Sequence, residues 1–126
     1  MKFKFSLDPV LKVRKHQEKI QKQKLAEQVA RKQKISNLQQ QVQGKLEDYL
    51  QNSENTQAEN IHMIRNRCVH MEMTHQEIDR LSKEIDKADV EVLKEREKLA
   101  AAHKKLHILE KVKEFEHNLF AEHTAK

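Results

Sequence analysis

Histidine is abundant in this sequence, with eight residues, and its imidazole can bind a metal. His103 and His107 lie four residues apart, so both imidazoles would share one helical face, and Glu110 could add a third ligand. The sequence has no HExxH motif, and the open surface of a long helix supplies no further groups to orient such ligands. We interpret these histidines as solvated, and we expect no metal site and no cofactor.

Neither the single cysteine nor the glycine content indicates a catalytic site. Cys68 and His75 fall on one predicted apolar stripe, where a packed thiol fits better than a nucleophile, because a rod of two helices offers no pocket and no oxyanion donors. One glycine in the chain is too few for a GxxxxGK[ST] or GxGxxG phosphate loop. We predict no catalytic residues and a protein that is not an enzyme. A lone cysteine also fits a reducing compartment.

The composition favours long helices over a compact globular fold. The chain has 126 residues, of which 36% are charged, 37% hydrophobic and 4% aromatic, with one Gly and one Pro. Globular domains usually contain about 45–50% apolar residues and about 7% Gly, so this chain lacks material for a wide core or many tight turns. We predict an all-α fold.

Two helices are expected, with one bend between them. Pro9 is tolerated in a first helical turn, and the first helix is expected over about residues 7–50. The polar segment QNSENTQAEN predicts a bend at about 51–60, followed by a second helix over about 61–122. Helices joined in this way fold back as an antiparallel coiled-coil hairpin, here a single unit over residues 1–126. With the bend near Asn55, facing residue numbers should add to about 110, so Tyr49 would meet Ile61 and Val42 would meet Cys68.

Apolar residues at steps of three and four mark the contact stripes of this hairpin. The first helix keeps this spacing from Ile35 to Tyr49, but its large apolar residues between positions 14 and 34 do not share one frame. The second helix shows two runs with a predicted three-residue slip near Ile78. The first run is Ile61, Ile64, Cys68, Met71, His75 and Ile78, and the second continues through Leu81, Ile85, Ala88, Val92, Glu95, Leu99, Ala102, Leu106 and Leu109.

Positive charge is concentrated at the N-terminal end. Residues 1–34 hold 11 Lys and Arg against three acidic residues, whereas residues 51–126 are close to balance. Such an arm attracts an acidic protein groove, an anionic membrane surface or nucleic acid, and charge alone does not choose among them. Two Arg and no Asn before Asn37 are few for reading bases. No apolar run is long enough for a membrane span, and the start lacks a secretory signal, so we expect a cytoplasmic protein.

The four Phe residues are expected to gather at one end of the hairpin. Phe3 and Phe5 lie near the N-terminus, and Phe115 and Phe120 lie near the end of the second helix. The cluster could cap the coiled coil, or it could insert into a partner protein, since exposed aromatic groups mark interfaces.

The terminal segments resemble those of a known family. The opening FKFSLDPVLKVR, residues 3–14, resembles the F-x-F-x-L-x-P-[LV]-L-x-[VL]-R start of the FliJ family of bacterial flagellar export proteins. The segment LEKVKE, residues 109–114, is similar to the family's [LVI]-E-[KR]-[LV]-[KR]-E stretch near its C-terminus.

The resemblance implies a coiled coil similar to the central stalk of rotary ATPases. Its terminal end would bind and activate a hexameric flagellar export ATPase through residues 3–24 and 106–120. The candidate ATPase-binding residues are Phe3, Phe5, Leu7, Leu11, Lys12, Arg14, Lys15, Leu109, Lys113 and Phe115.

The resemblance also implies contacts with the export gate and with export chaperones, at the cytoplasmic face of the inner membrane and without a membrane span of its own. The candidate gate-binding residues are Leu38, Val42, Leu46, Tyr49, Ile64, Cys68 and Met71. A free chain of this kind is expected to be a monomer that binds no nucleic acid. The alternatives are a basic coiled coil that binds nucleic acid and a homo-oligomeric structural protein whose helices pair between chains.

Overall fold

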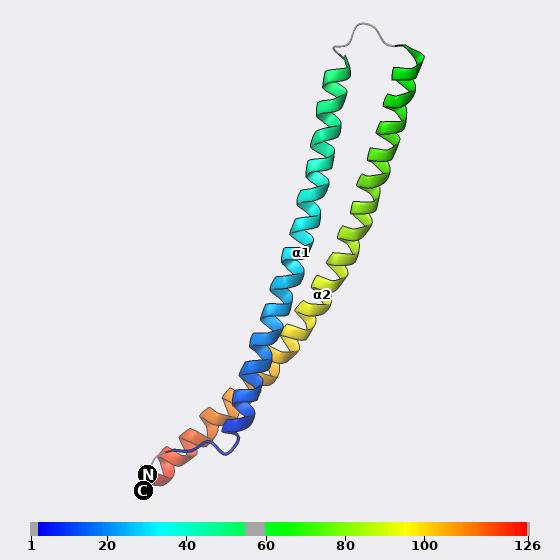
Figure 1. The fold of residues 1–126 in the computed structure, drawn as a ribbon. Helices are drawn as coiled ribbons and strands as arrows, with labels where there is room; N and C mark the ends of the chain where they lie inside the picture. Colours follow the sequence, from blue (N-terminus) through cyan, green and yellow to red (C-terminus); the bar gives the residue numbers. More distant parts are fainter. Residues whose placement is uncertain (1–2, 55–59, 126) are drawn as a thin grey trace. The chain divides into compact units, whose positions relative to one another are not determined.

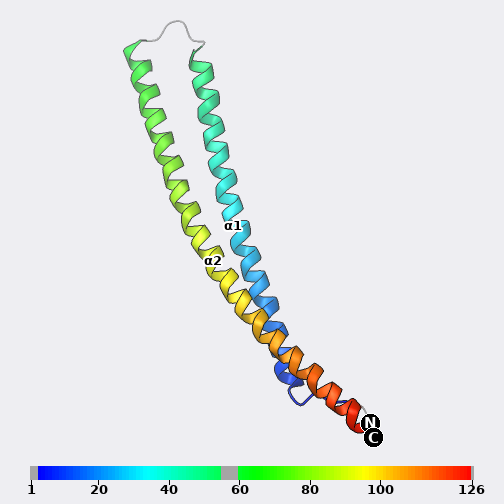
Figure 2. The same ribbon diagram turned by 180° about the vertical axis from the view of Figure 1, so that it is seen from behind.

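Two long helices account for nearly all of the computed structural model, which describes residues 3–54 and 60–125. Helix α1 spans Asp8–Glu54 and helix α2 spans Ile61–Ala125, and no strand occurs in these described ranges. The two helices pack against each other with opposite chain directions, as both ribbon views show (Figures 1 and 2). The predicted all-α antiparallel hairpin is therefore confirmed.

The helix ends are set by local hydrogen bonds. The Asp8 amide donates to the Phe5 carbonyl at 3.1 Å, and Pro9 follows in the first turn, where its missing N–H costs no helical bond. At the start of α2, the Met63 amide donates to Asn60 Oδ1 at 2.9 Å, which makes Asn60 the N-cap. Helix α1 extends four residues beyond its expected end, so residues 51–54 of the predicted bend are helical. The rest of that bend, 55–59, lies outside the described residues.

The chain divides into two compact units, which are treated separately below. The terminal unit comprises Met1–Gln28 and Val92–Lys126, and the middle unit comprises Val29–Glu91. In each unit, one section of α1 packs along one section of α2. The buried side chains lie in narrow stripes between the helices, because a two-helix hairpin has no wider core to fill.

The pairing of the helices differs from the predicted one by about ten residues. Tyr49 contacts His70 in the middle unit, and Glu18 contacts His103 in the terminal unit, so facing residue numbers add to about 120 rather than 110. The apolar residues of α1 explain the choice. At a sum of 120, Val42 lies level with Ile78, whereas the predicted pairing would have placed it against Cys68. Burial of apolar surface therefore favours the observed register over the one inferred from the bend.

The inward stripe of α2 also runs in one frame, without the predicted slip near Ile78. Its buried and half-buried positions pass through Met71, Thr74, Ile78 and Leu81 at steps of three and four. Thr74 takes the position that had been assigned to His75. His75, Cys68 and Ile64 are exposed, so the early part of the predicted stripe was wrong. The later part is buried as predicted, at Leu81, Ala88, Val92, Glu95 and Leu106.

The inward stripe of α1 follows the same spacing, but half of it is polar. Its positions are Leu11, Arg14, Glu18, Gln21, Leu25, Gln28, Lys32, Ile35, Gln39, Val42, Leu46 and Tyr49, and each is buried or half-buried. With these residues at heptad positions a and d, each layer pairs an a position of one helix with a d position of the other. A search for apolar residues alone finds no frame between positions 14 and 34, because the stripe there is mostly polar.

Candidate protein-binding surfaces

The N-terminal motif builds the apolar end of the terminal unit. Phe5 and Leu11 are buried together with Leu106 of α2, and Phe3, Leu109 and Val112 pack against this cluster. Four of the ten candidate ATPase-binding residues, Phe3, Phe5, Leu11 and Leu109, therefore help to hold the unit together. Their apolar surface is already used inside the fold.

Three of the four Phe residues associate, and the fourth does not. The Phe3 ring lies 5.5 Å from the Phe120 ring and 4.9 Å from the His117 ring, between ring centres. Phe115 stays 65% exposed on the surface of α2. The expected gathering of all four is corrected, because Phe115 falls outside the inward stripe of α2 and stays exposed.

The remaining terminal candidates differ in their freedom to meet a partner. Leu7 and Lys15 are exposed, and Lys12 is exposed with its Nζ 3.5 Å from an Asp8 carboxylate oxygen. Arg14 is half-buried in the contact stripe and donates to Gln17 Oε1 at 3.1 Å. Lys113 is half-buried beside Asp8 in a shallow groove that Phe3, Lys4 and Phe5 also line.

The middle-unit candidates divide in the same way. Leu46 is buried, and Val42, Tyr49 and Met71 are half-buried in the contact stripes. Leu38, Ile64 and Cys68 are exposed and are available to a partner without unfolding. The Tyr49 ring packs against the His70 ring at 4.6 Å between centres, not against Ile61 as predicted.

A polar cluster in the terminal unit was missed in the sequence. The carboxylate of Glu18 is nearly buried between the helices, 2.9 Å from Lys22 Nζ and 3.3 Å from His103 Nδ1. The hydrogen bond from Lys22 holds the pKa of Glu18 below its ordinary value, with a smaller contribution from His103, and both outweigh the opposing effect of burial. The signal was available, because Glu18 stands seven residues after Leu11 in the heptad frame.

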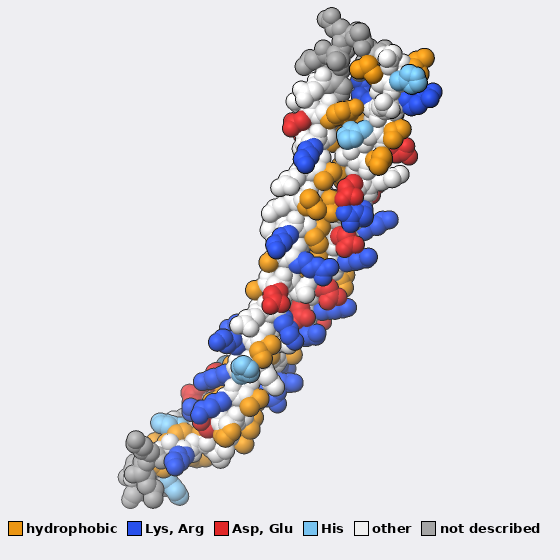
Figure 3. All heavy atoms as spheres, in the orientation of Figure 1, with side chains coloured by type: hydrophobic (Ala, Val, Ile, Leu, Met, Phe, Trp, Pro, Cys, Tyr) orange, Lys and Arg blue, Asp and Glu red, His pale blue; other side chains and the backbone are white. Residues whose placement is uncertain are grey.

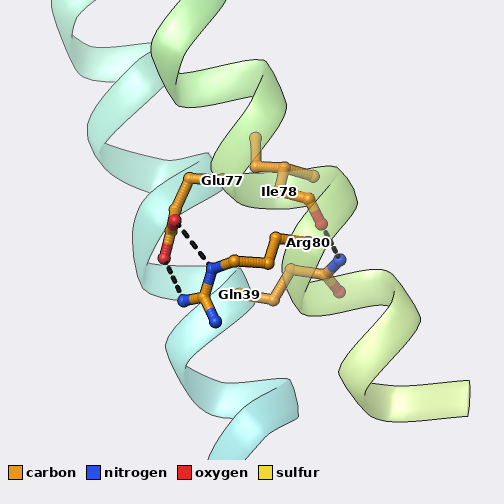
Figure 4. Close-up of polar contacts among 4 residues, drawn as sticks. All are labelled: Gln39, Glu77, Ile78 and Arg80. Atoms are coloured by element: carbon orange, nitrogen blue, oxygen red, sulfur yellow. Dashed lines mark hydrogen bonds and ion pairs between the residues drawn. The ribbon is translucent and has the colours of Figure 1, made fainter. Parts of the chain in front are cut away.

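The middle unit has a corresponding polar layer. Gln39 donates to the Ile78 carbonyl at 3.1 Å and to Ser82 Oγ at 2.6 Å across the two helices. Nearby on α2, Arg80 donates to the carboxylate of Glu77, which lowers the pKa of Glu77 (Figure 4). Lys32 forms an ion pair with Asp89, also between the helices. The bonds of Gln39 and Lys32 join the two helices and favour the same register as the apolar stripes, because a shift of one helix would leave their donors and acceptors unpaired.

The surface of the hairpin carries mixed charge. Lys and Arg side chains alternate with Asp and Glu along much of the visible face (Figure 3). No three His, Cys, Asp or Glu side chains come together to hold a metal ion within residues 3–54 and 60–125. Over the same part of the chain, neither helix has a segment apolar enough to cross a lipid bilayer.

Comparison with known proteins identifies the family. A family model described as flagellar FliJ protein matches residues 3–126, nearly the whole chain. No curated protein and no solved structure matches this chain. The match includes both the N-terminal motif that forms the Phe5 cluster and the segment of α2 that packs on it. The chain therefore belongs to the FliJ family and takes part in flagellar protein export.

Proposed function

We propose that the protein is a non-catalytic, stalk-like component of the flagellar type III export apparatus, which binds and activates the hexameric export ATPase. The observation that carries this proposal is the family match over residues 3–126. The terminal unit supports it, because a narrow pair of helices can enter the central opening of a ring. We place the protein in the cytoplasm, at the inner-membrane face of the flagellar base.

The terminal unit is the proposed ATPase-binding end. Its candidates Leu7, Lys12, Lys15 and Phe115 are exposed and can contact the ring. Phe5 and Leu11 are buried and stabilise the segment that carries them. Lysines on an exposed surface attract acidic groups at long range and speed association. The contact is therefore expected to weaken as salt is raised, because mobile ions screen exposed charges.

Charge reversal tests this contact. The purified chain should increase ring formation and ATP hydrolysis by its cognate export ATPase, and Lys12→Glu with Lys15→Glu should reduce both. Arg14 is left unchanged because it packs between the helices, so its loss would also disturb the fold. Lys45→Glu with Lys83→Glu is the matched control, since both lysines are exposed in the middle unit. Full activation by the Lys12/Lys15 variant would exclude these lysines, and no activation by the wild type at saturation would exclude the stalk function.

The middle unit is the proposed binding site for the export gate, and export chaperones are proposed as further partners. Leu38→Ser with Ile64→Ser should weaken binding to the cytoplasmic domain of the gate, because both side chains are exposed. Val69→Ser, on the outer face of α2, is the control. Equal binding of the gate domain by both variants would exclude Leu38 and Ile64 from the gate-binding site. Light scattering should give a monomer mass for the free chain, since each helix already has its partner within the chain.

A further inference from the structure

A second apolar stripe lies on the terminal section of α2, beside the one that faces α1. Ile108, Val112, Phe115 and Leu119 follow one another at steps of four, three and four, which is the spacing of a coiled-coil contact stripe. Ile108 is 53% exposed and Leu119 is 49% exposed, so most of this stripe has no cover. In the heptad frame set by Leu106 and Leu109, these residues occupy positions c and g.

Helix α1 carries a matching stripe. Val10 and Val13 also occupy positions g and c of their heptad, and both are exposed. They line a shallow groove with Pro9, Arg14 and Gln17. Positions g of two antiparallel helices lie on the same side of the pair. The middle unit shows this arrangement directly, because Arg31 of α1 and Glu91 of α2, both at position g, line one groove.

One face of the terminal unit therefore has apolar side chains from both helices. We call it the g face and define it by its apolar residues, which are Val10, Val13, Ile108, Val112, Phe115 and Leu119. The opposite side carries the contact of Glu18 with His103, at position e, so the two sides of this unit differ in chemistry.

The charges on the g face have one sign. At positions c, f and g of residues 9–24 and 104–119, all of them described by the structure, the charged side chains are Lys24, Lys104, Lys105 and Lys111. All four are exposed, and no carboxylate occurs at these positions. Carboxylates of the same segments, such as Glu110 and Glu114, occupy positions e and b on the other side. A partner on this face must therefore bring apolar groups at its centre and acidic groups at its edges.

We propose that the g face binds an amphipathic helix of a partner protein, with one apolar stripe and Asp or Glu at its flanks. The α2 row selects a helix, because its steps of three and four match apolar side chains at positions a and d of a third helix. This row extends over about 12 residues, or about 17 Å, which is three turns. Val10 and Val13 of α1 lie level with its first part, near Ile108. The proposal goes beyond the ATPase-binding function and does not depend on it.

A designed peptide tests the face. The probe is a labelled peptide of about three heptads with Leu at positions a and d and Glu at e and g, which keeps it from pairing with itself. Its binding to the full chain is measured by fluorescence anisotropy, alongside the same peptide with Lys in place of Glu. The acidic peptide should bind at least about tenfold more tightly than the basic one, and the difference should shrink as salt is raised.

Two variants locate the binding. Ile108→Ser with Phe115→Ser should weaken acidic-peptide binding about tenfold, as expected for loss of central apolar contacts. Leu93→Ser is the control, because Leu93 is 57% exposed on α2 but lies off the g face. Lys104→Glu with Lys111→Glu should also weaken binding, while Lys83→Glu, at the same heptad position in the middle unit, should not. All of these side chains are exposed, and an unchanged helical signal in circular dichroism verifies the fold.

The outcomes decide the proposal. Binding by the wild type that is lost with the g-face variants and kept with the controls supports a helix-binding face. Equal binding of acidic and basic peptides, or full binding by the Ile108/Phe115 variant, overturns it. Sedimentation with phosphatidylglycerol vesicles is the second arm. Vesicle binding that depends on Phe115, without peptide binding, would also overturn it and identify the face as a lipid-binding surface.

Discussion

The inward stripes of the two helices have different chemistry, although they form the same layers. Over the twelve positions from Leu11 to Tyr49, the stripe of α1 has six polar side chains. Over the twelve positions from Met71 to Leu109, the stripe of α2 has two, Thr74 and Glu95. Helix α2 therefore supplies most of the apolar surface, and α1 contributes much of the polar specificity. The hairpin therefore pairs a mostly apolar stripe of α2 with a half-polar stripe of α1.

The polar side chains of α1 have two consequences. Where they are paired, as Gln39 is with Ile78 and Ser82, they favour the register that the apolar residues set. Where these side chains are buried without a hydrogen-bond partner, they lower the stability of the fold. The Oε1 atoms of Gln21 and Gln28 are buried in this way in the terminal unit, and so is one carboxylate oxygen of Glu95 on α2. A buried polar atom without a partner costs about 1–3 kcal/mol.

The largest effect is expected from the stripe of α2. Leu81 is 2% exposed, and Leu81→Ala should lower the free energy of unfolding by about 2–4 kcal/mol, because it removes buried methyl groups and leaves a cavity. Urea unfolding followed by circular dichroism measures the change. The exposed Leu93 is the control, and Leu93→Ala should change stability by less than about 0.5 kcal/mol. Similar losses in the two variants would contradict the assigned stripe.

The stripe of α1 should respond in the opposite direction. Gln21→Leu and Gln28→Leu should each raise the free energy of unfolding by about 1 kcal/mol, because each removes a buried unpaired oxygen and adds apolar contact. Thermal unfolding of both variants measures the gain. Gln23→Leu, at an exposed position of the same helix, should give none. If the stripe variants are less stable than the wild type, these glutamines have partners that the structure does not show.

This difference between the helices also explains how much the sequence could predict. The all-α fold, the start of α2 and the stripe from Leu81 onward followed from regular apolar spacing. The stripe of α1 did not, because Glu18, Gln21, Gln28 and Lys32 hide its frame from any search for apolar residues. The predicted register was wrong, because it was counted from the bend. The observed register is set instead by which apolar residues of α2 pack against Val42 and Ile35.

The binding candidates show a similar limit. The N-terminal motif correctly indicated the family. It could not separate residues that hold the hairpin, such as Phe5, from residues that a partner can reach, such as Phe115. That separation depends on which face of each helix meets the other, and the g face became visible only once both heptad frames were known.

Gly44 offers a smaller test of the weak helix. It lies at outward position f of α1, and apart from its chain neighbours and the nearby backbone of its own helix, no atom lies within 4 Å of the place where a Cβ would be added. Gly44→Ala should raise the free energy of unfolding by about 0.5–1 kcal/mol, because glycine loses more backbone freedom on folding than alanine. Ala30 occupies the same heptad position and is exposed, so Ala30→Gly should lower stability by a similar amount. An unstable Gly44→Ala variant would indicate that α1 needs a flexible position there.

The smallest expected effect concerns Glu18, the charged residue in the stripe of α1. Its pKa is lowered in the folded state by the hydrogen bond from Lys22, with help from His103, so the folded protein favours the carboxylate more than the unfolded chain does. The resulting stabilisation is complete above the unfolded pKa of about 4.3, and it is lost as pH falls through the lower folded pKa. Glu18→Gln should therefore be less stable than the wild type at pH 7, and the difference should shrink as the pH is lowered below about 4. Thermal unfolding of both proteins across this range measures it. A difference that stays constant with pH would mean that the carboxylate acts only by packing, and the polar half of the α1 stripe would then stabilise the hairpin without its charge.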